Sequence, residues 1–439
     1  MKKYILLSLV ALMCLSVRAQ KVWTLKDCIG YALEHNISVK KSENNVRQSE
    51  VNLSSAKNKR LPNLDASASQ NWSFGRGLTS DNTYTDTNTR SLQLQLGTSV
   101  PLFTGFSVPN SIKFEKLNLE AAQYDLEKMR DDIRVQVAQA YVQILYNAEL
   151  CQVAERQTGI DSMHVDRLRE VFANGKASGA DVAAAEAALA QSRSMQVQAE
   201  NDYNMSLLSL TQLLELSSYD NFDVAVPDTA AANFMAIIPN PEDIFTMSLS
   251  IRPEIQAGSL RVKASERNEK IAKSGYLPKL SFNAGLGSNA YYTSGFTNKS
   301  MGNQLKNNFN QYVGLSLQIP LFDRFVTRNE VRAAKLRTVQ AGLDADNVRK
   351  NLYKEIQQAH CAAEASRANY MSGRKALTSN CKAFEMISQK YECGKSNITE
   401  FNEAKNNYLK AQSDYARAKY EYIYNTTLLK FYAGAELDF

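Results

Sequence analysis

The sequence predicts a mainly α-helical protein with a smaller β part, built from two similar repeats. Three observations lead to this fold class. Landmarks recur along the chain at a nearly constant offset, the nine prolines leave two long stretches without proline, and the segments between prolines alternate apolar and polar side chains. A fixed offset indicates a duplicated unit, proline breaks helix interiors, and a period of two is typical of strands.

The first residues have the pattern of a signal peptide over 1–19. Lys2 and Lys3 precede an apolar run, and small residues before Gln20 provide a cleavage site. We therefore expect an exported mature chain that begins at Gln20. The alternative is a lipoprotein with its lipid on Cys14, although a bulky methionine precedes that cysteine.

Composition excludes several classes of function. The formal net charge of +6 falls to about +3 once the three basic residues of the signal peptide are removed, so we expect no nucleic-acid partner. The three histidines are isolated, which predicts no metal site, and nothing indicates another cofactor. The sequence offers no set of nucleophile, base and orienting residue, so we do not expect an enzyme.

The offset between the repeats is visible in the prolines. Pro62 and Pro278 lie 216 positions apart, whereas Pro101 and Pro320 lie 219 apart. Three residues are therefore inserted in the second repeat between Pro278 and Pro320.

Each repeat is expected to contain one long helical hairpin. Apolar residues recur at near-heptad spacing in the proline-free stretches, which is typical of coiled coils. Gly175 and Gly394 end the first limbs, and Ser178 and Asn397 have the residue types that cap the second. The expected bounds are 20–226 for the first repeat, with helices at about 110–174 and 178–216; 227–240 for a linker or belt segment; and 241–439 for the second repeat, with helices at about 324–393 and 397–432.

Each repeat is also expected to contain one pair of strands. The expected strands are about 64–74 and 91–103 in the first repeat, and about 280–288 and 311–321 in the second. Each has one apolar and one polar face, and aromatic side chains gather at both ends, as in strands that cross a membrane. A soluble hairpin with one buried face is the alternative. Export and the aromatic residues favour transmembrane β-hairpins.

Several motifs in this order resemble the TolC-like outer-membrane efflux proteins. They are Thr24-Leu25-x-Asp27, Arg252-Pro253-Glu254-Ile255, Leu-Pro at 61 and 277, Pro-Leu-Phe-x-x-Phe at 101–106 and 320–325, and the patterns at 172–182 and 391–401. The resemblance covers about 24–432 and is specific because the motifs occur together and are doubled.

The resemblance implies a homotrimer in which four strands per chain close a 12-stranded barrel on an α-helical tube. It implies a location in the outer membrane of a Gram-negative bacterium, in contact with outer-membrane lipid and with an extension into the periplasm. The implied function is the channel of a tripartite efflux or type I secretion system. The implied partners are a periplasmic adaptor (membrane fusion) protein and an inner-membrane pump of the RND or ABC type.

The resemblance also implies roles for particular residues. The strand-to-helix junctions would contain Pro62, Pro101, Pro278 and Pro320, and the tips that dock the adaptor would contain Gly175, Lys176, Gly394 and Lys395. Glu400 and Glu403 would form a ring of carboxylates that narrows the periplasmic mouth. Asp181 and Tyr391 would link the two hairpins as a latch, while an arginine of the family's second link is replaced by Ser396.

Two alternatives remain at this point. Glu400 and Glu403 also suit the first turn of any helix, where a capping box and the helix dipole favour acidic side chains. A periplasmic coiled-coil adaptor or scaffold would also combine helical hairpins with β structure, but adaptors usually have one hairpin rather than two.

Overall fold

The computed structural model describes residues 22–78, 82–220, 222–227 and 238–437. The predicted signal peptide, Cys14 and most of the predicted linker at 227–240 lie outside these residues. The chain divides into two compact units. Unit 1 comprises Met1–Asn44, Tyr124–Ile255 and Asn347–Phe439, and unit 2 comprises Asn45–Gln123 and Gln256–Asp346. Each unit therefore takes segments from both sequence repeats.

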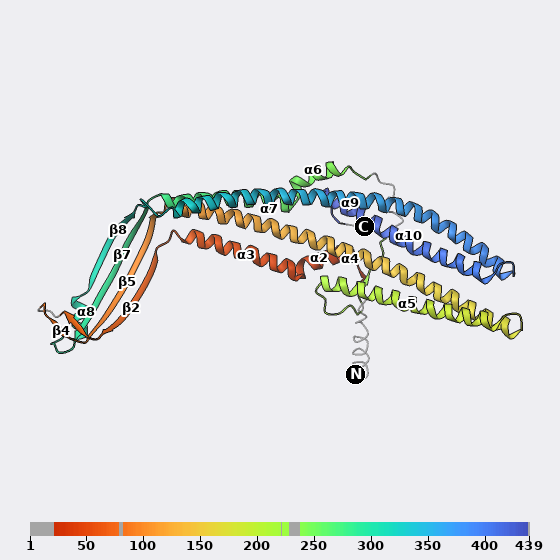
Figure 1. Ribbon diagram of the computed structural model, residues 1–439, viewed down its shortest axis with the longest axis horizontal. Helices are drawn as coiled ribbons and strands as arrows, with labels where there is room; N and C mark the ends of the chain where they lie inside the picture. The colour runs from red at the N-terminus through yellow and green to blue at the C-terminus, as the bar shows by residue number, and fades with distance from the viewer. Residues whose placement is uncertain (1–21, 79–81, 221, 228–237, 438–439) are drawn as a thin grey trace, which may run out of the picture. The chain divides into compact units, whose positions relative to one another are not determined.

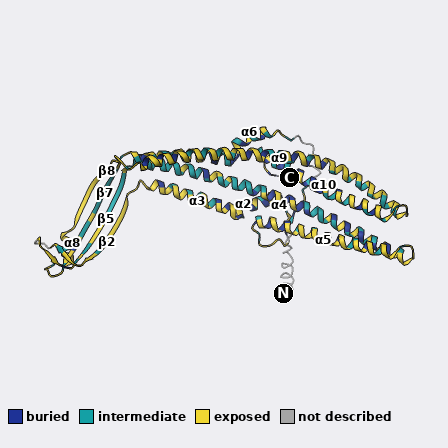
Figure 2. Ribbon diagram, in the orientation of Figure 1, coloured by how far each residue is buried: buried dark blue, intermediate teal, exposed yellow. Residues whose placement is uncertain are grey.

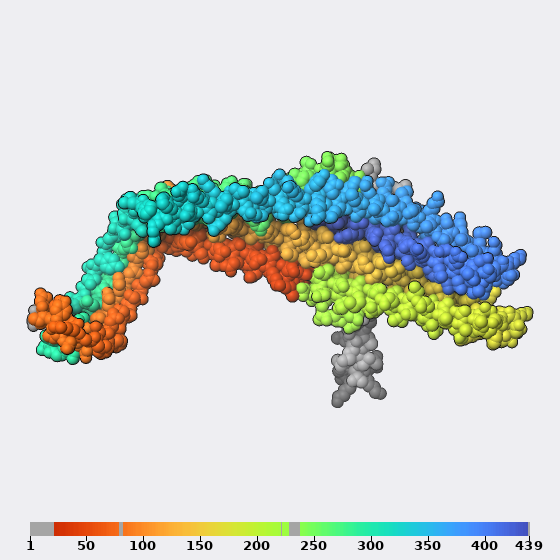
Figure 3. All heavy atoms as spheres, in the orientation of Figure 1, coloured from red at the N-terminus to blue at the C-terminus, as the bar shows by residue number. Residues whose placement is uncertain are grey.

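Unit 2 contains a four-stranded antiparallel sheet in the order β2-β5-β7-β8. The strands are β2 (Asn63–Ser73), β5 (Thr89–Phe103), β7 (Lys279–Thr293) and β8 (Asn310–Gln318). Leu96 lies opposite Ala66 on one neighbouring strand and Leu286 on the other, so apolar side chains form rows on one face. The two edge strands are exposed along nearly their whole length, and the two central strands are partly exposed (Figure 2). Figure 3 shows the heavy atoms of the same strands.

The loops of the sheet contain structure that the sequence did not suggest. A short hairpin pairs β3 (Arg76–Leu78) with β4 (Tyr84–Asp86), and a helix, α8 (Met301–Asn307), lies between β7 and β8. Strand β7 continues past the predicted end at 288, although its pairing with β8 ends at Gly287. Side chains around α8 replace the missing partner strand: Asn308 Nδ2 donates to the Asn289 carbonyl at 2.8 Å, and Gln304 Oε1 accepts from the Tyr291 N–H at 2.8 Å.

The four junction prolines lie where strands begin, bend or end. Pro62 and Pro278 directly precede β2 and β7, and Pro320 follows β8. Pro101 lies within β5, at a point where the register with β7 shifts, which is a position that tolerates the missing N–H.

The turns into the long helices repeat across the duplication. Phe106 and Phe325 both have a positive φ, of 65° and 64°. Each packs edge-on against a phenylalanine three residues earlier, with ring centroids 5.2 and 5.5 Å apart. The two repeats thus use the same turn.

Two helices of 67 residues, α4 (Ser107–Ala173) and α9 (Val326–Glu392), run from unit 2 into unit 1. At 1.5 Å per residue each is about 100 Å long. Pro109 falls in the first turn of α4, where a missing N–H is tolerated. The shorter helices α3 (Ile37–Asn58) and α7 (Pro253–Lys273) also contribute to both units, and a 3₁₀ turn at Ser274–Tyr276 follows α7.

In unit 1 the long helices turn back into α5 (Gly179–Leu213) and α10 (Ile398–Tyr432). Two short helices, α2 (Leu25–His35) and α6 (Pro241–Ile251), begin the two repeats. A pair of two-residue parallel strands, β1 (Val22–Trp23) and β6 (Asp223–Val224), completes the unit. The largest apolar cluster joins α2, α4, α5 and α10; its fully buried members include Cys28, Val137, Ile144 and Leu210.

Equivalent residues tie the two short helices to the ends of the returning helices. Asn36 follows α2, and its Nδ2 donates to the Leu213 carbonyl at the end of α5 at 2.9 Å. Arg252 follows α6, and its guanidinium donates to the Phe431 carbonyl near the end of α10 at 2.6 Å. The same helix-end contact is made by a neutral amide in one repeat and by a cation in the other.

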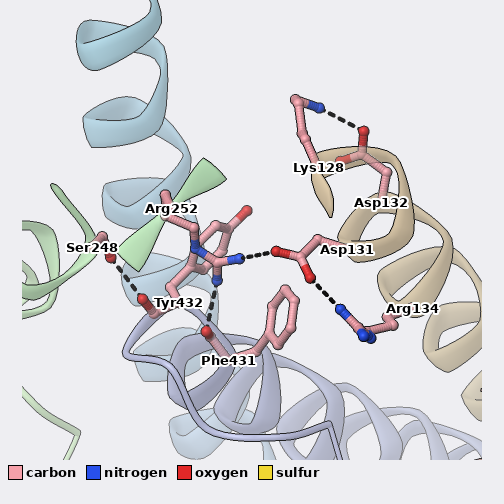
Figure 4. A network of polar contacts seen from close by, with 8 residues as sticks. All are labelled: Lys128, Asp131, Asp132, Arg134, Ser248, Arg252, Phe431 and Tyr432. Atoms are coloured by element: carbon pink, nitrogen blue, oxygen red, sulfur yellow. Dashed lines mark hydrogen bonds and ion pairs between the residues drawn. The ribbon is translucent and has the colours of Figure 1, made fainter. Parts of the chain in front are cut away.

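Arg252 is the centre of a buried polar network (Figure 4). Its guanidinium also pairs with Asp131 of α4 at 3.1 Å, although the Arg252 side chain is only 6% exposed. The cation lies 4.3 Å from the Phe431 ring centroid and 4.9 Å from that of Tyr432. Burying a charge is costly unless it is paired. The buried position of Arg252 therefore depends on its ion pair with Asp131 and on its contacts with Phe431 and Tyr432.

We expect Arg252→Ala to destabilise the protein more than Asn36→Ala does. Loss of Arg252 removes its hydrogen bond to the Phe431 carbonyl and leaves the half-buried Asp131 carboxylate with Arg134 as its one ionic partner among the described residues, at a cost of about 3 kcal/mol. Loss of the neutral Asn36 amide costs about 1 kcal/mol. The measurement is the helical circular dichroism of the detergent-solubilised protein during thermal unfolding. Equal shifts of the midpoint for both variants would contradict the ranking.

Candidate functional site

The tips of the two helical hairpins lie at the same end of unit 1 and are built alike. The Lys176 N–H donates to the Val171 carbonyl at 3.0 Å, and the Lys395 N–H donates to the Lys390 carbonyl at 2.8 Å. Gly175 and Gly394 have φ angles of 70° and 68°, in the region that favours glycine. These bonds satisfy the last carbonyls of α4 and α9, so each tip can project into solvent.

Side-chain caps begin the returning helix at each tip. Ser178 and Asp181 form a reciprocal capping box at the start of α5. At the start of α10, Asn397 Oδ1 accepts from the Glu400 N–H at 2.8 Å. The Ser396 hydroxyl donates to the carboxylate of Glu400, which is a predicted gate residue.

Glu400 and Glu403 are both exposed on the first turns of α10. Three residues apart on a helix, they lie on one face. Lys405 lies two residues beyond Glu403, so its side chain points about 200° around the helix from that of Glu403. Lys405 is buried. The packed side of α10 is therefore opposite the side that carries Glu403.

The predicted latch residues are neighbours but have other direct contacts. Asp181 Oδ2 accepts from the Ser178 N–H at 3.1 Å as part of its own helix cap. The Tyr391 ring packs on Phe401, with centroids 5.0 Å apart, and lies under the Arg167 guanidinium at 5.8 Å. Burial raises the pKa of the Tyr391 hydroxyl, Arg167 lowers it and the Asp181 charge raises it, so the carboxylate is within electrostatic reach.

A buried ion pair that was not among the sequence-based predictions connects the hairpins farther from the tips. Lys405 Nζ on α10 lies 2.6 Å from Asp161 Oδ1 on α4, and the two side chains are 5% and 3% exposed. The other oxygen of Asp161 accepts from Gln157 Nε2 at 2.6 Å and from the Ser192 hydroxyl on α5. This Asp161 network joins three helices through one carboxylate.

A signal for this network exists in the sequence. Phe401, Ala404, Lys405 and Ala411 are all buried on one side of α10. A lysine at a helical position that otherwise packs indicates a buried acidic partner, because such a charge is rarely buried alone. The sequence could not identify the partner, which lies 244 residues away.

Two further contacts lie beside the network. Lys419 of α10 pairs with Glu149 of α4 at 3.2 Å, with side chains 17% and 27% exposed. The ring of His164 stacks on Phe401 with centroids 5.3 Å apart. Burial and the nearby Lys405 charge lower the pKa of His164 from its ordinary value of 6.5, although Asp161 opposes this. His164 is therefore held neutral between the hairpins near neutral pH.

In the described part of the chain, no group of three or more His, Cys, Asp or Glu is placed to hold a metal ion. Across the same residues, no helix is both long enough and apolar enough to cross a lipid bilayer.

Residues 28–215 and 245–435 match the outer membrane efflux protein family. The chain is 22% identical over 402 residues to the outer membrane efflux protein BepC of Brucella suis, covering 91% of this chain and 83% of BepC. It is also 22% identical to the outer membrane protein TolC of Escherichia coli, covering 78% of this chain and 74% of TolC.

The fold matches solved structures of the same kind. The crystal structure of the Campylobacter jejuni CmeC outer membrane channel aligns with a TM-score of 0.78 at 19% identity, covering 94% of this chain and 87% of CmeC. The chain belongs to the outer membrane efflux protein family. It is an outer-membrane channel subunit, and the family match favours this function over the adaptor alternative.

We expect Lys405→Met to loosen the packing of α10 against α4 by about 3 to 5 kcal/mol, because it leaves the Asp161 carboxylate buried without its cation. Amide hydrogen exchange of residues 157–168 and 398–411 measures the change. Asp161→Asn combined with Lys405→Met should recover most of the protection, since the remaining amide can still bond Gln157 and Ser192.

Lys419→Met is the matched control for this prediction. It removes the same charge from the same helix, at a more exposed pair with Glu149 that contributes about 1 kcal/mol or less. Equal exchange in Lys405→Met and Lys419→Met would show that the Asp161 network has no special part in holding the hairpins.

Proposed function

We propose that three copies of this chain assemble into one channel whose wall in the membrane is a closed barrel of twelve strands. The supporting observation is the sheet itself, which has four strands, an exposed apolar face, and β2 and β8 as its two edges. In lipid, backbone groups at a sheet edge must be paired, so an open four-stranded sheet cannot stand alone there. Pairing β2 of one subunit with β8 of the next satisfies both edges.

The channel passes substrates from a periplasmic adaptor and an inner-membrane pump to the exterior, and nothing in this role requires catalysis. The two hairpins of each subunit continue the conduit as an α-helical tube. In this assembly the tips face the periplasm, because the sheet lies at the other ends of α4 and α9. An RND pump and an ABC pump are both compatible with the chain.

Glu400 and Glu403 form the proposed gate of this channel. The position of these two residues supports the gate assignment. Both are exposed, share a face of α10, and lie opposite the side on which Lys405 is buried. Three subunits would bring six carboxylates around one axis, and a ring of like charges attracts multivalent cations. The Ser396 hydroxyl, which contacts Glu400, takes the place of the arginine that the family's second link uses.

The contacts of Asp181 and Lys405 favour a latch that differs from the Asp181 and Tyr391 link implied by the family resemblance. Asp181 acts on Tyr391 through its charge, while the Asp161 network supplies a direct ion pair between the hairpins. We therefore assign the main closing contact of this channel to Asp161 and Lys405. The Asp181 and Tyr391 pair is a weaker addition to it.

We expect Glu400→Gln with Glu403→Gln to weaken the block of the pore by multivalent cations at least about tenfold, because each lost charge removes on the order of 1 kcal/mol of attraction. The measurement is planar-bilayer conductance of the purified trimer. Glutamine preserves the capping geometry at Glu400 while removing its charge.

Glu34→Gln with Glu436→Gln is the control, because it removes two exposed acidic charges away from the tips. This control should leave cation block and selectivity unchanged. Unaltered block in the gate variant would make Glu400 and Glu403 ordinary helix-start residues, whereas a purified protein that is monomeric by mass would refute the assembly.

The exposed tip turns are the proposed docking site for the adaptor. Lys176 and Lys395 follow the two tip glycines, and both are exposed. We expect single cysteines at these positions to crosslink to an adaptor in cells with a short bifunctional reagent. A cysteine at Asn88, in the loop before β5, should not crosslink. Equal products from Asn88 would reverse the proposed orientation of the channel.

A further inference from the structure

A row of three residues crosses the sheet near the end of β5 that lies away from α4. Trp72 on β2 lies directly opposite Arg90 on β5, and Arg90 lies opposite Tyr292 on β7. On the same face of β5, the next residues toward α4 are apolar, Leu92, Leu94 and Leu96, and their neighbours include Gln70 on β2 and Ser288 on β7. An arginine between two aromatic residues therefore ends the apolar face.

The length of the apolar face fixes the depth of this row. From Arg90 to Val100, β5 rises about 33 Å. At a tilt of about 40° this corresponds to about 25 Å, the height of the apolar band of outer-membrane strands. Given the assembly proposed above, on which this inference rests, the row lies at the outer surface of the membrane, where lipid headgroups begin.

A cavity of about 530 Å³ opens at this row. Its lining includes Gln70, Arg90, Tyr292 and Lys299, the last from the loop before α8. The lining contains no Asp or Glu, and within the described residues neither cation has an ion-pair partner. Gln70 Nε2 also has no hydrogen-bond acceptor there. The cavity thus holds two cations and an amide donor without matching acceptors.

A second cavity, of about 420 Å³, lies on the same face nearer the helices. It is lined mainly by apolar side chains, among them Leu94, Leu96, Leu286 and Phe309. A cationic cavity at the membrane surface followed by an apolar cavity within the apolar band fits an amphipathic molecule with an anionic head.

We propose that this face binds an outer-leaflet lipid by a phosphate group of its headgroup. Arg90 and Lys299 contact the phosphate, the aromatic rings of Trp72 and Tyr292 flank it, and the acyl chains lie along the apolar cavity. Guanidinium and ammonium groups are the usual partners of phosphate, and each cation near such a surface contributes about 1 kcal/mol. The site would couple the loops around α8 to the lipid of the outer leaflet.

Native mass spectrometry of the purified trimer in detergent tests the proposal, with lipid A carrying two phosphates as the probe. Wild-type protein should bind up to one lipid per subunit. Arg90→Gln with Lys299→Gln should weaken binding about 10- to 30-fold, as expected for two lost contacts. Lipid A without phosphates should bind wild-type protein as weakly as it binds the variant.

Two controls separate the site from general charge and from misfolding. Arg76→Gln with Lys306→Gln removes two exposed positive charges from the same loops but outside the cavity, and should leave binding intact. Arg90→Lys with Lys299→Arg keeps both charges and should retain most of the affinity. Equal binding by the glutamine variant and wild type would overturn the proposal.

Inorganic phosphate distinguishes the lipid from a free anion. At a concentration equal to that of the lipid, inorganic phosphate should not displace lipid A. Displacement of lipid A by phosphate at this concentration would reassign the site to soluble anions. The number of lipids bound per subunit can be counted for a trimer or for a monomer, whichever the mass spectrum contains. Absence of the trimer would therefore refute the assembly without deciding the lipid site.

Discussion

Backbone hydrogen bonding at the edges of the sheet is the constraint on which the rest of the structure depends. Four antiparallel strands with one apolar face cannot satisfy their two edges alone in lipid. The closure between subunits that we propose satisfies both edges, and it requires that each chain present matching edges, β2 and β8. Duplication suits this requirement, because each repeat supplies one strand pair together with one helical hairpin.

The duplicated parts keep their geometry while their chemistry diverges. The phenylalanine turns before α4 and α9 are nearly identical, as are the glycine turns at the tips. At the equivalent anchors, however, Asn36 uses one neutral hydrogen bond, whereas Arg252 combines an ion pair, a carbonyl contact and two aromatic rings. A buried cation depends on every partner, so the second repeat tolerates less change there.

Near the tips, helix ends and hairpin contacts are stabilised by different means. Local bonds satisfy the backbone at each turn, so the helix ends do not depend on contacts between the hairpins for their hydrogen bonds. The two hairpins contact each other through the ring of His164, which packs against Tyr391 and Phe401, and through polar contacts, chiefly Asp161 with Lys405.

The sequence by itself determined the helices, the strands and their duplication, because proline positions, helix caps and apolar periodicity act within a few residues. It also placed Gly175 and Gly394 at turns and Glu400 at a helix start, for the same local reason. Only the tertiary structure paired Lys405 with Asp161, joined Arg252 to Phe431 and aligned Arg90 with Trp72 and Tyr292. These contacts join residues far apart in the chain, and a pattern along one strand or helix does not specify the register of another.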